Sequence, residues 1–133
     1  MQITRQADYA LRAVTFLSSL NGDQKASTSS IAEKQSIPPS FLAKIVSQLS
    51  IAGLIQTSRG ARGGVSLAKP PDEISVLDVI EAIDGPILLN VCAGNPESCP
   101  LGESCPLQQI WYDTRSELIG RLSSATFAPV TVA

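Results

Sequence analysis

The sequence contains no histidine, a single tryptophan and a single methionine, and only 5% of its residues are aromatic. The lack of histidine removes the usual general base and a common metal ligand. The chain also lacks a phosphate-binding glycine loop and a recognisable pair of catalytic carboxylates, so we expect no enzymatic activity. Long hydrophobic runs are missing too, so no membrane span is expected. Residues 1–20 mix charged with apolar side chains and resemble no export signal, which predicts a cytoplasmic protein.

Charged residues are also few, at 17%, whereas hydrophobic residues make up 44% of the 133 positions. This composition is typical of one globular domain with at most an appended element. The net charge of −2 conceals an asymmetry: residues 1–69 carry +5 and residues 70–133 carry −7. A polyanion such as DNA would be attracted to the first part and repelled by the second.

The periodicity of apolar residues predicts five helices and one β-hairpin. The first helix covers residues 4–20, and a second covers 29–35, where Ser30 and Glu33 have the spacing of a capping box. The third begins at Pro38–Pro39, ends at Gly53 and has a buried stripe of Phe41, Leu42, Ile45, Val46 and Leu49.

The hairpin strands are expected at residues 54–58 and 65–68, around a basic, glycine-rich tip. Ser75 and Asp78 should cap a fourth helix over 76–83, whose Val76, Val79, Ile80 and Ile83 face inward. An irregular loop over 84–105 then leads to a long last helix over 106–124.

Three helices followed by a hairpin is the order of a winged helix–turn–helix DNA-binding domain, expected here over residues 1–71. The fold class is therefore mainly α with a small β-hairpin, and residues 72–133 supply a helix, the loop and a dimerisation helix. The candidate DNA contacts are Ser40, Lys44 and Gln48 on the outward face of the third helix, and Arg59, Arg62 and Gly63 in the hairpin tip.

The three cysteines, Cys92, Cys99 and Cys105, fall within 14 residues of the expected loop. Thiolates on irregular backbone suit an iron–sulfur cluster, although gaps of six and five residues match no ferredoxin pattern. Three alternatives stay open: small buried apolar residues, a zinc site and a thiol redox switch.

The first helix, the helix from Ser40 and the segment Thr57-Ser58-Arg59-Gly60-Ala61-Arg62-Gly63-Gly64-Val65 resemble the Rrf-type transcription regulators, the family of IscR, NsrR, RirA and CymR. The resemblance covers about residues 1–124. It implies a homodimer that binds double-stranded DNA at a palindromic operator, with contacts from Ser40 and Arg59. Residue 43, which is acidic in IscR, is Ala43 here, so the operator sequence is left open.

The same resemblance implies a cluster on Cys92, Cys99 and Cys105, with [4Fe–4S] favoured over [2Fe–2S]. The histidine that IscR uses as fourth ligand corresponds to Gln108 here. In NsrR an aspartate in a similar D-x-A-L-R run reaches the cluster of the other subunit, which makes Asp8 of the partner subunit the candidate. The alternative for Asp8 is an ion pair with Arg5 or Arg12 on its own helix.

The last helix is expected to form the dimer interface through Leu107, Ile110, Trp111, Leu118 and Leu122. The predicted function is a cluster-dependent regulator, by default a repressor, that senses nitric oxide, redox state or iron status. One alternative is a cluster-free winged-helix regulator that uses direct thiol chemistry or a protein partner. The other is an iron–sulfur electron-transfer or assembly protein, which would have no evident need for the basic hairpin.

Overall fold

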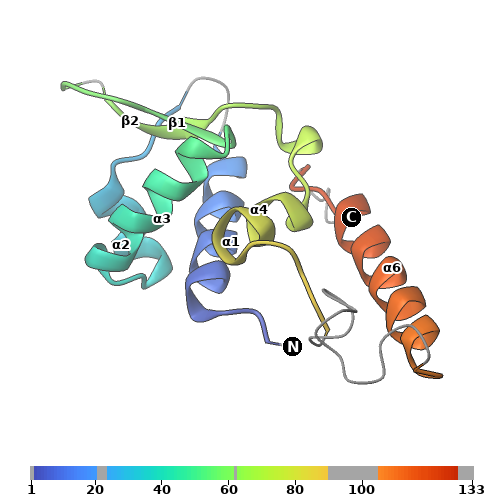
Figure 1. Cartoon of the computed structure of the whole chain (residues 1–133). Helices are drawn as coiled ribbons and strands as arrows, with labels where there is room; N and C mark the ends of the chain where they lie inside the picture. The colour runs from blue at the N-terminus through green and yellow to red at the C-terminus, as the bar shows by residue number, and fades with distance from the viewer. Residues whose placement is uncertain (1, 21–23, 62, 90–104, 129–133) are drawn as a thin grey trace.

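The computed structural model describes residues 2–20, 24–61, 63–89 and 105–128. Its first helix, α1 (Arg5–Ser18), packs against three other helices and the hairpin (Figure 1). Its small buried face, which includes Ala10 and Val14, lets its neighbours approach closely. Thr4 caps the helix by accepting a hydrogen bond from the Ala7 amide (3.1 Å). The cap is also tied to the end of a later helix, because the Thr4 amide and hydroxyl both donate to the Asp84 carboxylate (3.2 and 2.5 Å).

Helix α2 (Thr28–Gln35) begins one residue earlier than predicted and has a different cap. Ser27 is the N-cap and accepts from the Ser30 amide at 3.1 Å, so the predicted capping box from Ser30 to Glu33 is wrong. The reason is a long-range pairing: both backbone groups of Ala26 bond to Val65 of the hairpin (3.0 and 2.7 Å). This bridge fixes the backbone at Ala26, and the helix begins directly afterwards with Ser27 as its cap.

Helix α3 (Pro39–Ile51) buries Leu42, Ile45 and Leu49, as predicted. Two further members of the predicted buried stripe differ. Val46 is only half-buried, and Phe41 is 42% exposed, since it lies in the first turn, beyond the edge of the core, and contacts the ring of Tyr9 instead.

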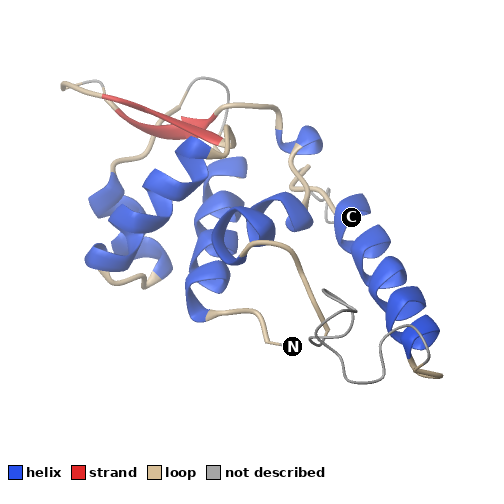
Figure 2. Cartoon of the chain, in the orientation of Figure 1, coloured by secondary structure: helices blue, strands red, loops and turns tan. Residues whose placement is uncertain are grey.

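The hairpin consists of β1 (Ile55–Ser58) and β2 (Gly64–Leu67), which pair antiparallel with Ile55 opposite Leu67 and Ser58 opposite Gly64. Figure 2 shows it in red above α2 and α3, with its tip pointing away from α4 and α6. Ile55 and Val65 anchor it to the helical core, whereas its tip is exposed.

A 3₁₀ turn, η1 (Pro71–Glu73), leads into α4 (Val76–Asp84). The predicted capping box is present: the Asp78 amide donates to Ser75 Oγ and the Ser75 amide donates to the Asp78 carboxylate, both at 3.0 Å. Val79 and Ile80 are buried as predicted, Val76 and Ile83 are half-buried, and Leu77 is an additional buried residue.

Ile74 and Val79 belong to the same hydrophobic core as α1 and α3, so this core continues past residue 71. The packing therefore does not separate two units at residue 71. The division into a DNA-binding part before this residue and a dimerisation part after it stays a prediction.

Helix α6 (Gln108–Ser124) starts two residues later than predicted and lies beside α4 (Figure 1). None of its residues, all of which the structure describes, is fully buried in the single chain. Within the described ranges no helix is both long enough and apolar enough to cross a membrane.

Candidate nucleic-acid interface and cysteine region

The outward face of α3 presents Ser40 and Lys44 to solvent, as predicted. Gln48 was predicted on the same face but is half-buried. Its Oε1 atom is buried and, within the described part of the chain, has no hydrogen-bond partner. The fully exposed polar side chains of this helix are therefore hydroxyls and one ammonium, which can contact phosphates and base edges.

The hairpin tip carries Arg59, which is exposed to solvent. The tight turn beneath it depends on two glycines: Gly60 has φ +98°, and the Gly63 amide donates to the Gly60 carbonyl at 2.9 Å. A Cβ atom at Gly63 would collide with the backbone of Ser58 and Arg59. The predicted site residue Gly63 thus shapes the tip, while Arg62 lies outside the described residues.

Lys25, which was not singled out in the sequence, adds a cation beside the hairpin. Its Nζ atom donates to Ser58 Oγ at 2.8 Å, across a separation of 33 residues. No local pattern predicts this contact, because it follows from the pairing of Ala26 with Val65.

Cys105 is the one cysteine within the described ranges; Cys92 and Cys99 lie outside them. Its thiol is free and the residue is half-buried. It closely precedes α6, and its carbonyl accepts from the Gln108 amide at 3.1 Å. Among the described residues there is no group of three or more cysteine, aspartate or glutamate side chains that could hold a metal ion.

Asp8 lies on α1 and forms an ion pair with Arg12 one turn later (2.8 Å), which is the alternative that the sequence left open. Arg12 also stacks over the Tyr9 ring (5.5 Å to the centroid), and Tyr9 contacts Phe41 with ring centroids 6.1 Å apart. A continuous set of contacts therefore connects Asp8 on α1 with the first turn of α3.

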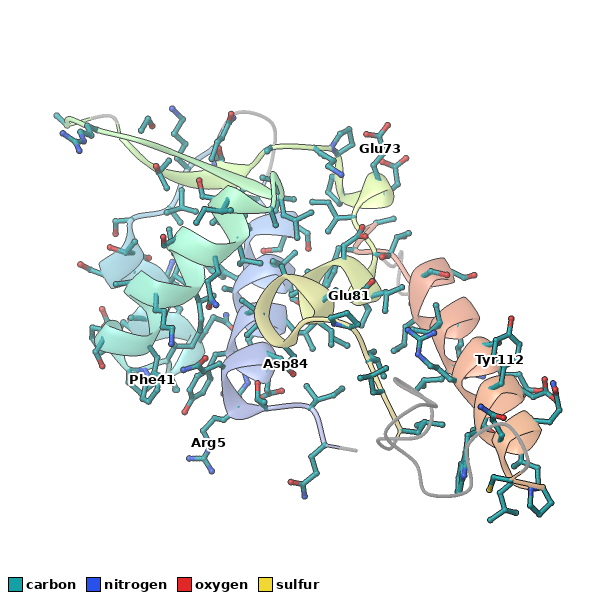
Figure 3. All side chains as sticks on the ribbon, viewed as in Figure 1. Arg5, Phe41, Glu73, Glu81, Asp84 and Tyr112 are labelled. Carbon is teal, nitrogen blue, oxygen red and sulfur yellow. The ribbon has the colours of Figure 1, made fainter. Side chains whose placement is uncertain are left out.

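The apolar residues predicted for the dimer interface fall into two groups on and beside α6. Leu118 and Leu122 pack against a cluster around α4 of the same chain. Leu107 and Ile110 are about half exposed, and Trp111 is partly buried. Figure 3 shows Tyr112 on the side of α6 that points away from α4, and it too is exposed. The N-terminal half of α6 therefore keeps an apolar surface without cover from the described part of its own chain.

Comparison with known proteins agrees with this arrangement. Residues 3–132 match the family described as "Rrf2: Iron-dependent Transcriptional regulator". A Mycobacterium tuberculosis protein assigned as an HTH-type transcriptional regulator, MT1325, is 33% identical over 130 residues, which cover 98% of this chain and 81% of the relative.

Two solved structures show the same fold. CymR, described as the global cysteine regulator of B. subtilis, has 29% identity and a TM-score of 0.80, with 96% of this chain and 93% of that chain covered. IscR from T. potens has 26% identity and a TM-score of 0.76, with 96% and 84% covered. The predicted fold class, a winged helix–turn–helix with an added C-terminal helix, is confirmed, and these relatives are regulators rather than enzymes.

Proposed function

Because the chain belongs to the Rrf2 family of DNA-binding transcriptional regulators, we propose that it is an iron–sulfur-dependent member of this family. The observation that carries the proposal is the set of three cysteines shortly before α6, in a chain without histidine. A bound cluster would supply a centre whose ligation changes with nitric oxide, oxygen or iron supply. The expected default is a repressor that releases its operator when the cluster is lost.

The donor chemistry fits such a group. The Cys105 thiol is free and half-buried, two residues before the N-cap of α6, where the helix favours negative charge. Cys92 and Cys99 would complete three thiolates, a set that suits iron–sulfur clusters. Zinc sites usually use close CxxC pairs, and the chain contains none.

The fourth ligand proposed is Asp8 of the partner subunit. In the single chain Asp8 is held by Arg12, but both side chains are about half exposed (52% and 46%). Exposed ion pairs contribute at most about 1 kcal/mol, so Asp8 could exchange Arg12 for another partner at little cost. On loss of the cluster, Asp8 would pair with Arg12 again.

This exchange would reach the DNA-binding surface through α1. Arg12 stacks on Tyr9, and Tyr9 contacts Phe41 in the first turn of α3, next to Ser40. A change in the Asp8–Arg12 pair would therefore be transmitted to the first turn of α3, where this helix is expected to contact DNA. In this proposal α1 is the element that couples the two sites.

A homodimer on a palindromic operator is part of the same proposal. The exposed apolar surface at the start of α6, with Leu107 and Ile110, supports a two-fold contact between chains. Each chain would then place one α3 and one hairpin in a half-site.

Purification without oxygen, followed by an absorbance spectrum and iron and sulfide counts, tests the proposal. We expect a coloured protein with both elements bound, and loss of both in Cys105→Ser. A colourless protein without iron, even after reconstitution with iron and sulfide, would contradict it.

The Asp8 assignment has a separate test. Asp8→Ala should change the spectrum or its response to nitric oxide, and Asp113→Ala, an exposed acid on α6, serves as the control. If the two variants have the same spectrum and the same response to nitric oxide, Asp8 is not a ligand of the cluster.

A cluster-free regulator that uses its thiols directly is the second candidate. The likeness to CymR, described as a cysteine regulator, favours this candidate. It predicts an iron-free protein whose operator affinity changes on thiol oxidation and recovers on reduction.

A further inference from the structure

A shallow hollow of about 330 Å³ lies between α3 and β1. It is lined by Ala43, Val46, Ser47, Ser50, Ile51 and Thr57. Ala43, Ser47 and Ile51 are spaced by four residues along the helix, so they form one stripe on its exposed side. Because α3 occupies the recognition position of a winged helix, this hollow belongs to the surface expected to meet DNA.

Side chains that hydrogen-bond strongly to particular bases are scarce on this helix. α3 contains no Arg, Asn, Asp or Glu, and Lys44 is its single cation. Its one amide side chain, Gln48, keeps Oε1 buried, unlike a glutamine presented to adenine. What the exposed stripe offers is methyl groups and small hydroxyls.

Ile51 gives the hollow an apolar end that the described part of the chain leaves uncovered. It is 85% exposed, at the last residue of α3. A single exposed isoleucine is common on protein surfaces. Here, however, the Ile51 side chain lines a hollow whose lining also includes Ala43 and Val46.

We propose that this hollow takes the 5-methyl group of a thymine, so that the operator carries thymine opposite α3. Among the base edges in the major groove, the thymine methyl is the apolar group, and small apolar side chains are its usual contacts. The inference builds on the DNA-binding part of the proposed function and specifies what α3 reads. It does not depend on the cluster.

The experiment starts with selection of binding sequences from random DNA, using both the cluster-loaded and the metal-free protein. Each thymine of the selected half-site is then replaced singly by deoxyuridine, which keeps base pairing and lacks only the methyl group. Since burial of one methyl or methylene contributes about 0.8 kcal/mol, the critical replacement should weaken binding about fourfold.

Protein variants link that loss to the hollow. Ala43 and Ile51 lie about two helical turns apart on the hollow, so in at least one of Ala43→Ser and Ile51→Ser the uridine penalty should shrink toward none, because the apolar contact is then missing. Ala52→Ser changes a neighbouring exposed alanine outside the hollow and should keep the full penalty. All three positions are exposed, so the fold should be retained.

Selected sites without thymine in either half, or unchanged affinity at every uridine position, would overturn the inference and leave DNA binding intact. A penalty that persists in Ala43→Ser and Ile51→Ser would also overturn it. A protein that selects no sequence in either form would overturn the inference together with the proposed function.

Discussion

At the scale of single residues, the hairpin tip shows how a few positions set the form of a DNA-contacting surface. Gly63 leaves no room for a side chain, since the backbone of Ser58 and Arg59 occupies the place of its Cβ atom. Gly60 supplies a left-handed φ of +98°. Together they hold the tip that carries Arg59, whose guanidinium is free to enter a minor groove or contact phosphate.

Arg59→Ala should weaken operator binding about tenfold and lower the salt dependence of the affinity by about one counterion. The cation is exposed, so the free energy of unfolding should hardly change. A gel-shift titration at several salt concentrations measures both effects. Arg121→Ala, an exposed cation on α6, should leave binding unchanged, and equal affinities for Arg59→Ala and the native protein would exclude a contact from the tip.

At the scale of elements, the start of α2 gives a sharp comparison between two serines. Ser27→Ala removes the cap and should lower the free energy of unfolding by about 1 kcal/mol. Ser30→Ala should change it by only a few tenths, because Ser30 contributes its backbone amide and alanine favours helix. Urea denaturation of both variants checks this, and a larger loss in Ser30→Ala would contradict the observed cap.

The contact between α1 and α3 leads to a prediction about coupling. Phe41→Leu keeps an apolar side chain but removes the ring that meets Tyr9. The operator affinity with cluster, divided by the affinity without cluster, measures the coupling. We expect this ratio to be about threefold lower in Phe41→Leu than in the native protein, within the range found for residues that transmit coupling. Phe16→Leu, on α1 but next to Lys34, is the matched control. An unchanged ratio in Phe41→Leu would exclude this route.

Most elements of the fold could be predicted from the sequence because their signals are local. The Ser75–Asp78 box, the proline start of α3 and the glycine-rich hairpin each depend on neighbouring residues, and all three are present. The cap of α2 could not be predicted, since it depends on a backbone pairing between Ala26 and Val65.

The candidate site was predictable to a similar degree. Ser40, Lys44 and Arg59 are exposed as expected, because helical spacing and the hairpin turn fix their direction. The exposure of Phe41 and the burial of the Gln48 Oε1 atom depend on how α1 packs on α3. The apolar periodicity of a single helix carries no information about this packing.

At the scale of the whole molecule, the net positive charge and the exposed apolar surface of α6 are separated. Residues 1–69, with α3 and the hairpin, carry the net positive charge, and residues 70–133 carry the negative. The uncovered apolar residues of α6 lie in the negative part, away from the hairpin (Figure 1). Such a distribution suits a protein that binds DNA with one side and a second copy of itself with another.

Leu107→Asp combined with Ile110→Asp should convert a dimer into a monomer, because charges would replace the exposed apolar surface at the start of α6. Sedimentation equilibrium measures the change. The melting temperature of the native protein should rise with its concentration, and that of the double variant should not. Glu117→Gln, at an exposed acidic residue of the same helix, is the control and should leave the dimer intact. A native protein that is already monomeric would contradict the proposed interface.

In the proposed function, the state of a cluster on Cys92, Cys99 and Cys105 controls binding to DNA. The decisive experiment measures the operator affinity of one anaerobic preparation before and after its iron is removed with a chelator. We predict that the affinity falls at least tenfold on removal, a coupling of about 1.4 kcal/mol, and returns on reconstitution. Equal affinities in a preparation shown to contain iron and sulfide would contradict it.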